Sequence, residues 1–515
     1  MPKPSWSGAV SRQIVQRIVV EGDLVLQTPA HFGNGDGADL VDMPLLTDPL
    51  DNKTPLLTGT SIAGALRGYV REREHGFRQK IDPYTRADQS ASVLLFGGNK
   101  GNEYGEQSPL IVEDARGKNA AIELRDGVRL AGVSRTSAED ALFTIEMWEA
   151  GTTFPLRFEL IVRSYDNASA LKRALATALV GFNDDSITIG ARKRRGYGQV
   201  SVTGWRVKAY DLTNTEELLD WIANGANELS GTASPDIVQA LGVGEMIADQ
   251  RRAFRLKGTF SLDGSLLIRS GSGPDIAQTA ANVTDGQQPD MVHLHSARLA
   301  SPLDKTRKRM PIVSGTSLAG ALRARAFKIA RLLAPQIDAG KTAAREVIEG
   351  MFGVEMEKME LGAKPRASRI TVSEHEVHME SEVKNTLIQQ RVSLDRFTGG
   401  ARDSALFSQQ PLFGGPQSQV IVELRLANPQ EYEIGLLLLV LKDLWSGDLP
   451  LGGEVSVGRG RLRGQHCHLE YQNGQVRSWD LSANEANGLD VAGGQSQDLE
   501  HYVAALHAHL DGRNP

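Results

Sequence analysis

Residues 59–67 read GTSIAGALR, and residues 315–323 read GTSLAGALR, 256 positions later in a chain of 515 residues. Further landmarks recur in the same order: Phe96-Gly97 with Phe352-Gly353, Arg135 with Arg396, and Gly196-Tyr197-Gly198 with Gly458-Arg459-Gly460. The offset grows only from 256 to 262 residues across these landmarks, which indicates a duplicated domain with small insertions. A repeat of this length is a tandem pair of domains, because solenoid repeats are about 20 to 50 residues long.

The repeated phrase predicts the start of a helix in each half. Gly59 ends the preceding segment, and Thr60 or Ser61 is a good N-cap residue. An apolar stripe with helical spacing follows, made of Ile62, Leu66, Tyr69 and Val70.

Strand and helix patterns repeat in one order around the phrase. The first half has expected strands at residues 11–26, 108–114, 154–162 and 199–208, and a second helix at 168–181. The second half has expected strands at 252–268, 368–372, 419–426 and 461–471, and helices at 316–332 and 431–445. The order βαββαβ is the ferredoxin-like pattern. We therefore expect an α+β protein of two tandem RRM-like domains with inserted loops, at residues 1–250 (with an acidic linker) and 251–515 (with a polar tail).

Composition narrows the possible classes. The net charge is −6, so any role with nucleic acid must depend on local basic patches. The single cysteine, Cys467, excludes an internal disulfide and suits a reducing compartment. No apolar run approaches the roughly 18 residues of a membrane span, and the chain start lacks a signal-peptide pattern. We expect a cytoplasmic protein with no membrane partner. A sugar or nucleotide enzyme is disfavoured, because no P-loop, zinc-ligand spacing or Gly-x-Ser-x-Gly is present.

The strongest basic cluster lies in residues 191–198, which read ARKRRGYG. Its four consecutive cations are Arg192, Lys193, Arg194 and Arg195. Glycines allow backbone amides to approach a phosphate closely, and arginine pairs with phosphate oxygens. A solvated basic turn would explain one such loop equally well, but Gly458, Arg459 and Gly460 keep glycine and arginine at the same place in the second copy.

The helix start in each half is a second candidate anion site. A helix N-terminus offers free N–H groups and a partial positive charge. The candidate residues are Gly59, Thr60, Ser61 and Arg67 in the first half, and Gly315, Thr316, Ser317 and Arg323 in the second.

Residues 41–49, VDMPLLTDP, followed by residues 54–61, TPLLTGTS, resemble the backbone subunits of type III CRISPR effector complexes, which belong to the RAMP superfamily. Those subunits carry an Asp two residues before a Pro, then Asp-Pro, then a Pro-x-x-x-Gly-Ser/Thr-Ser phrase that opens a helix, and they end in a Gly-rich loop. The resemblance covers residues 10–208 and 252–471. Two such domains in one chain resemble the fused double-backbone subunit of type III-D systems.

The resemblance implies that the chain binds a CRISPR guide RNA, organises the guide–target duplex and cleaves target RNA, together with other type III effector subunits. It also implies a β-hairpin thumb in each half. The candidate thumbs are residues 129–153 and 390–415, which align through Arg135 and Arg396, both expected to contact RNA. Asp42 lines up with the family's catalytic aspartate, and a divalent ion, Mg²⁺ being the expected one, would assist cleavage.

The second copy departs from the pattern at the catalytic position. His295 stands where Asp42 stands in the first copy, and Asp290 is the nearest upstream acid. The second half therefore either cleaves through Asp290 after a shift of its loop or only binds RNA. The sequence identifies no metal ligands. Two alternatives stay open for the whole chain: a non-catalytic RNA-binding scaffold, and a guide-processing ribonuclease of the same superfamily.

Overall fold

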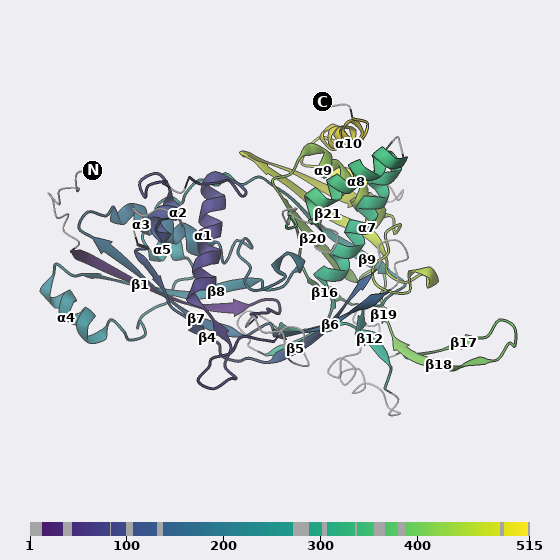
Figure 1. Ribbon diagram of the computed structural model, residues 1–515, viewed down its shortest axis with the longest axis horizontal. Coiled ribbons are helices and arrows are strands. Elements are labelled where there is room, and N and C mark those ends of the chain that lie inside the picture. The colour runs from purple at the N-terminus through teal and green to yellow at the C-terminus, as the bar shows by residue number, and fades with distance from the viewer. Residues whose placement is uncertain are drawn as a thin grey trace, which may run out of the picture.

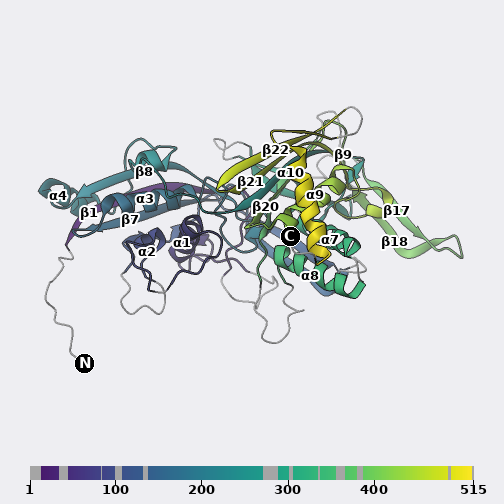
Figure 2. The same cartoon turned by 90° about the horizontal axis from the view of Figure 1, so that it is seen from above.

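The computed structural model (Figure 1) describes residues 13–33, 44–82, 84–98, 107–130, 137–270, 288–300, 306–334, 337–354, 366–379, 387–484 and 489–512. Two sheets, each with helices packed on one face, lie side by side along the longest axis of the molecule (Figures 1 and 2).

The first half is built on an antiparallel sheet of four strands in the order β3-β7-β1-β8. These strands are β1 (Ile14–Leu26), β3 (Leu110–Val112), β7 (Thr153–Arg163) and β8 (Val200–Asp211). Buried residues alternate with half-buried ones along β7, which is the pattern of a sheet covered on one face. The covering helices are α1 (Gly59–His75) and α3 (Ala168–Val180), whose apolar stripes share one core with β1.

The second half repeats this arrangement around β9 (Ala253–Asp263). Its neighbours are β20 (Gln419–Ala427) and β21 (Arg461–Asn473), and β15 (Ile370–Val372) pairs with β20. The helices α7 (Gly315–Leu333) and α9 (Glu431–Trp445) pack over a separate core. Counted within each βαββαβ unit, both sheets have the strand order 2-3-1-4. The predicted α+β fold with two ferredoxin-like domains is therefore confirmed.

Additional strands widen the second sheet on both sides. The full path is β13-β14-β16-β20-β9-β21-β22-β23. The added strands are β13 (His295–Leu299), β14 (Arg307–Val313), β16 (His375–His378), β22 (Gln475–Ala483) and β23 (Leu489–Ala492).

Further elements lie outside the two sheets and their covering helices. They are β2 (Leu56–Leu57), α2 (Ala91–Phe96), β4 (Ala115–Arg116), η1 (Lys193–Arg195), β10 (Ser265–Leu266), β11 (Arg269–Ser270), β12 (Met291–His293), α8 (Ile337–Phe352), β19 (Leu412–Phe413), η3 (Val455–Val457) and α10 (Ser496–Leu510). The acidic segment 209–250 contains α4 (Thr215–Asn224) and α5 (Ile237–Ala240). No helix in the described ranges is long and apolar enough to cross a membrane.

The repeated phrase begins a helix as predicted, but the predicted cap was wrong. The N-cap is Thr58, whose side chain accepts a hydrogen bond from the backbone N–H of Ser61. Ser314 has the same role for Ser317 at the start of α7. The cap therefore precedes the glycine, and Gly59 is already the first helical residue.

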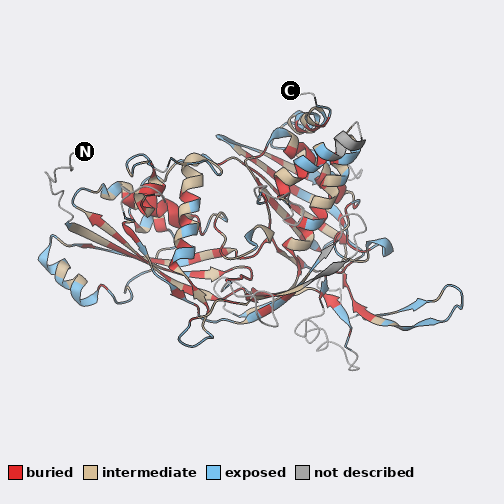
Figure 3. Ribbon diagram, viewed as in Figure 1, coloured by how far each residue is buried: buried red, intermediate tan, exposed pale blue. Residues whose placement is uncertain are grey.

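Each half carries an inserted β-hairpin, and the two hairpins lie in different surroundings. The first consists of β5 (Ile122–Leu130) and β6 (Ser137–Trp148), so it begins earlier than the expected range 129–153. The second consists of β17 (Gln389–Leu394) and β18 (Ala401–Gln410). In Figure 1, β5 and β6 run from the first half beneath the second, whereas β17 and β18 project away from the body. Figure 3 shows this second hairpin as mainly exposed.

A buried ionic network fastens the first hairpin to the second half. Arg125 on β5 pairs with Glu123 at 2.6 Å and donates two hydrogen bonds to Glu374, one of them at 2.9 Å. Arg298 on β13 also pairs with Glu374, and the Ser296 hydroxyl donates to Glu123 at 2.9 Å. All five side chains are buried, so the network joins the two halves away from water.

Candidate nucleic-acid interface

The basic Gly-rich loop of the first half is a tight turn that only glycine permits at two places. A Cβ at Gly198 would lie 1.8 Å from the carbonyl oxygen of Ile189, and one at Gly196 would lie 2.6 Å from the backbone nitrogen of Glu374. Both glycines also have positive φ, as does Arg192 at 52°. The loop is therefore packed against the second half rather than free in solvent.

The four consecutive cations of this loop point to three different places. The guanidinium of Arg192 lies over the ring of Phe143 on β6, 4.4 Å from its centroid. Arg195 lies beside α7 of the second half, and burial together with the charge of Arg323 lowers its pKa. Lys193 and Arg194 line a cavity between the halves. The sequence predicted these cations as one cluster, but the turn of η1 separates them.

The start of α7 meets this loop directly. A Cβ at Gly315 would lie 2.1 Å from the carbonyl oxygen of Arg195, so the first turn of α7 packs on the backbone of η1. The structure brings together residues that were predicted from separate parts of the sequence. Arg195 lies in the loop, and Ser317 and Arg323 lie in α7, the helix that packs on it. Thr316 and Ser317 are half-buried beside the cap residue Ser314.

The start of α1 lies at the surface of the first half. Thr60 and Ser61 are exposed, and both contact the hydroxyl of Thr58. Gly59 donates its N–H to the carboxylate of Asp114 at 2.7 Å. Arg67 lies along α1, and its guanidinium donates to the carbonyl oxygens of residues 97 and 98, each at 3.4 Å.

The second Gly-rich loop keeps the backbone of the first but not its charge. Gly458 and Gly460 have positive φ, and a Cβ at Gly460 would lie 1.8 Å from a carbonyl oxygen. Glu454 takes the left-handed conformation that Arg192 has in the first loop, and residues Val455–Val457 replace the three cations. Arg459 is buried and pairs with Glu454 at 3.3 Å, a carboxylate that it shares with Arg269 and Arg391.

Two aspartates were predicted as catalytic and two arginines as RNA contacts of the thumbs. Of these four residues, the structure describes Asp290 and Arg396. Asp42 and Arg135 lie outside the described residues. Arg396 is exposed at the turn of the projecting hairpin. Asp290 precedes β12, and its carboxylate accepts hydrogen bonds from the backbone N–H of Ser408 at 2.7 Å and from the Ser408 hydroxyl at 3.1 Å.

The two histidines near the second catalytic position have structural partners. The Nε2 of His293 lies 2.9 Å from the carbonyl oxygen of Ile312, and its Nδ1 accepts the backbone N–H of Ile268 at 3.2 Å. The Nδ1 of His295 lies 2.7 Å from the carbonyl oxygen of His293. These contacts fit packing roles.

The described residues do not form a site for the expected Mg²⁺. Among them, no group of three His, Cys, Asp or Glu side chains could hold a metal ion. Asp290 is a single carboxylate already bonded to Ser408. Magnesium is commonly held by one or two carboxylates together with water and substrate phosphates, so the expected Mg²⁺ stays a prediction.

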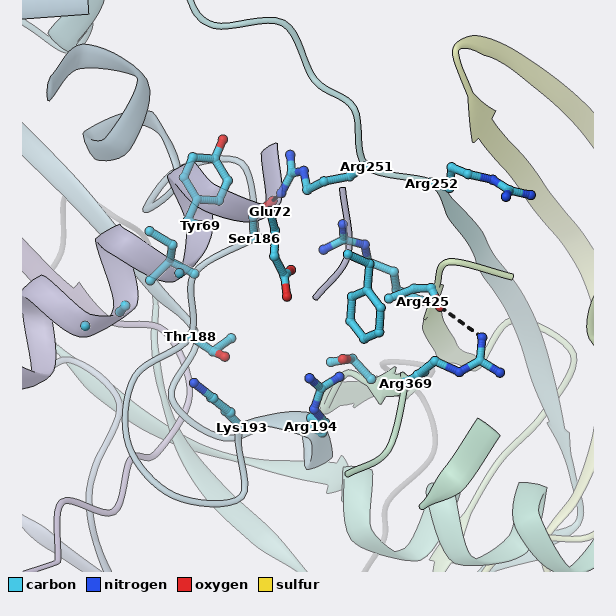
Figure 4. A pocket seen from close by; sticks show the side chains of 17 residues that line it. Tyr69, Glu72, Ser186, Thr188, Lys193, Arg194, Arg251, Arg252, Arg369 and Arg425 are labelled. Carbon is cyan, nitrogen blue, oxygen red and sulfur yellow. Dashed lines mark hydrogen bonds between the residues drawn. The ribbon is translucent and has the colours of Figure 1, made fainter. Parts of the chain in front are cut away.

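A strongly basic cavity of about 200 Å³ lies between the two halves (Figure 4). The residues that line it include one carboxylate, Glu72, and six cations, namely Lys193, Arg194, Arg251, Arg252, Arg369 and Arg425. The sequence analysis identified only the first two cations. The other four stand at the start and inside the second half, and only the contact between the halves brings them to the loop.

Comparison with known proteins gives one positive result. A sequence profile of the RAMP superfamily matches the chain twice, at residues 23–201 and 266–463. A search of curated proteins gave no significant match.

Proposed function

The chain belongs to the RAMP superfamily as two tandem domains, and from this premise we propose that it is an RNA-binding backbone subunit of a type III CRISPR effector complex. Its ligand is a CRISPR guide RNA, on which it organises the duplex with target RNA beside other effector subunits. The observation that carries the proposal is the packing of the basic loop of the first half on the helix start of the second, at Arg195 and Gly315.

The electrostatics of this junction support phosphate binding. Burial is the largest cause of the lowered pKa of Arg195, and the neighbouring charges of Arg323, Arg192 and Arg194 lower it further. A phosphate beside these arginines would relieve both their mutual repulsion and their incomplete hydration. The fixed backbone on both sides of the junction would hold a sugar–phosphate chain without reading its bases.

An RNA-binding measurement tests this proposal. Replacing Arg192 and Arg195 by Ala should weaken binding to RNA of any sequence. On single-stranded RNA, the slope of log affinity against log salt should flatten by about 0.7 for each phosphate that the variant no longer neutralises. Arg477→Ala, at an exposed arginine of β22, is the matched control. Unchanged affinity and salt slope in the double variant would refute the proposed junction.

We further propose that the first half cleaves target RNA through Asp42. In the second half, the hydrogen bonds from Ser408 to Asp290 favour a binding-only role over cleavage. End-labelled target RNA incubated with the assembled complex distinguishes the cases. Asp42→Ala should remove one product band, while Asp290→Ala should leave the pattern unchanged. If the pattern survives Asp42→Ala as well, the chain is the non-catalytic scaffold of the same complex.

A further inference from the structure

Some of the cations that line the cavity between the halves form ion pairs with acidic side chains, and others do not. Arg251 pairs with Asp249 at 2.6 Å, and Arg369 pairs with Glu433. Figure 4 shows that Arg369 turns aside to a carbonyl oxygen, that of Ala427 at 3.3 Å, while Arg425 points into the cavity. These two arginines, Arg251 and Arg369, are therefore already neutralised by the protein.

Arg425 lacks such a partner among the described residues. Its side chain makes no ion pair or hydrogen bond with them, and its Nε atom is buried without an acceptor. Arg252 differs, because Figure 4 shows its side chain extending away from the cavity, where its guanidinium donates to the carbonyl oxygen of Pro429 at 3.4 Å and to the hydroxyl of Tyr471 at 3.1 Å. An unpaired buried donor on a charged group is unfavourable, so such groups normally have a partner.

The charges around Arg425 repel it further. Burial lowers the pKa of Arg425 to about 10, and the nearby positive charges of Arg251 and Arg255 add to the effect, while the carboxylates of Asp184 and Glu72 offset part of it. Burial also lowers the pKa of Lys193 and of Arg194, which face the cavity from the first half. Cations from both halves thus converge on a space that contains one carboxylate.

We propose that this cavity binds a compact phosphate group, held between Arg194 of the first half and Arg425 of the second. A guanidinium pairs with two phosphate oxygens at once, which would satisfy the buried donors. The volume of about 200 Å³ is below that of typical pockets for drug-sized ligands, roughly 300–1,000 Å³, so a phosphate or pyrophosphate group fits better than a whole nucleotide.

The side of the cavity formed by α1 of the first half leaves room for such an anion. Gly64 and Gly68 of α1 border the cavity, and a Cβ added at either glycine would meet nothing within 4 Å. The site shares the Gly-rich loop with the proposed RNA junction, and Arg194 adjoins both, whereas Arg425 belongs to the cavity. It therefore extends the proposed function without depending on Arg192 or Arg195.

Binding of inorganic pyrophosphate to the full chain, without RNA, tests the proposal. At constant ionic strength set with NaCl, pyrophosphate should raise the melting temperature in a saturable way, because it binds the folded state. Calorimetry should show binding weakened by about tenfold or more in Arg425→Met, and by less in Arg425→Lys, which keeps the charge without the fork. Arg477→Met should bind as the unsubstituted chain does.

The unliganded variants supply an independent readout. Without pyrophosphate, Arg425→Met should be at least as stable as the unsubstituted chain, because it removes a desolvated and repelled charge. If Arg425→Met does not fold, Arg425→Lys and Arg194→Met carry the measurement. The proposal is wrong if no saturable binding occurs, or if Arg477→Met weakens binding as much as Arg425→Met does.

Competition identifies the source of the phosphate. ATP should displace pyrophosphate if the ligand is a free nucleotide presenting its phosphates. If the ligand is an RNA end, a 5′-phosphorylated oligonucleotide should displace pyrophosphate and its 5′-hydroxyl counterpart should not. Equal displacement by both oligonucleotides would make the cavity part of the RNA path and overturn a separate site. The double variant of Arg192 and Arg195 tests whether the two proposals are independent. If it loses RNA binding but still binds pyrophosphate, the cavity and the RNA junction are separate sites.

Discussion

At the scale of single residues, Glu374 is the buried carboxylate on which the contact between the halves depends. It is paired with Arg125 and Arg298, both nearly inaccessible to water. Glu374→Gln leaves the buried Arg298 without a close carboxylate and leaves Arg125 with Glu123 alone, and we expect it to lower the free energy of unfolding by about 3–5 kcal/mol. Denaturant unfolding measures the decrease.

Two comparisons make the prediction for Glu374 specific. Glu376→Gln removes a half-buried carboxylate 4.0 Å from the Nε of Arg298 and should change stability by less than about 1 kcal/mol. Burial alone would raise the pKa of Glu374, but Arg125 and Arg298 outweigh it and lower the pKa below the ordinary 4.5. The stabilisation is therefore present above pH 4.5 and lost as pH falls through the folded-state pKa. A deficit in Glu374→Gln that does not shrink in acid, or that Glu376→Gln equals, contradicts this account.

Residue-level prediction from sequence succeeded where the signal was local. The start of a helix at each repeated phrase is such a short-range feature, although the predicted cap was wrong, since the cap of α1 is Thr58 rather than Thr60 or Ser61. Arg425 and Arg252 gave no such signal, because each stands alone in sequence and joins the cavity only through the packing of one half on the other.

At the scale of elements, Ala substitutions at the two glycines of α7 should change the stability of the protein in opposite directions. A Cβ at Gly315 would meet the carbonyl oxygen of Arg195 at 2.1 Å, so Gly315→Ala should force the halves apart and lower stability by about 1–3 kcal/mol. Gly320 is exposed in the same helix with nothing within 4 Å, so Gly320→Ala should raise stability by about 0.5–1 kcal/mol. Thermal unfolding of the pair measures both. Equal effects would show that the junction at Arg195 does not constrain the helix.

Helices and strands could be predicted where their apolar residues follow a single helical or strand spacing from end to end. The helix 431–445 and the strand 419–426 were predicted within a residue of α9 and β20. The strands β13, β14, β22 and β23 were missed, although most of them pair with a strand nearby in the sequence, because their residues show little regular apolar alternation. The start of the first hairpin was missed for a different reason, since β5 is held by contacts with the second half.

At the scale of the whole molecule, duplication has produced two equivalent hairpins with unequal support. The first is fixed to the second half by buried ions, whereas the second projects with Phe397 97 % exposed. Beyond its base, where β18 pairs with β12, the projecting hairpin has only its own two strands, and such a two-stranded segment is only marginally stable and opens locally. Among the described sites in the two hairpins, we expect trypsin to cut after Arg396 long before it cuts after Arg125. Mass spectrometry of early digests should detect the fragment ending at Arg396 first.

Two further digests show whether the difference lies in the hairpins themselves. Arg396→Gln should delay the first cut without changing the rate at Arg125, because only the exposed site is removed. Glu374→Gln should accelerate cleavage at Arg125, since it weakens the contact that holds β5 against the second half. If RNA lies along the projecting hairpin as proposed, saturating RNA should slow cleavage at Arg396 and leave Arg125 unaffected. Early cleavage at Arg125 in the unsubstituted chain would contradict the docking of the first hairpin, and with it the asymmetry between the two repeats.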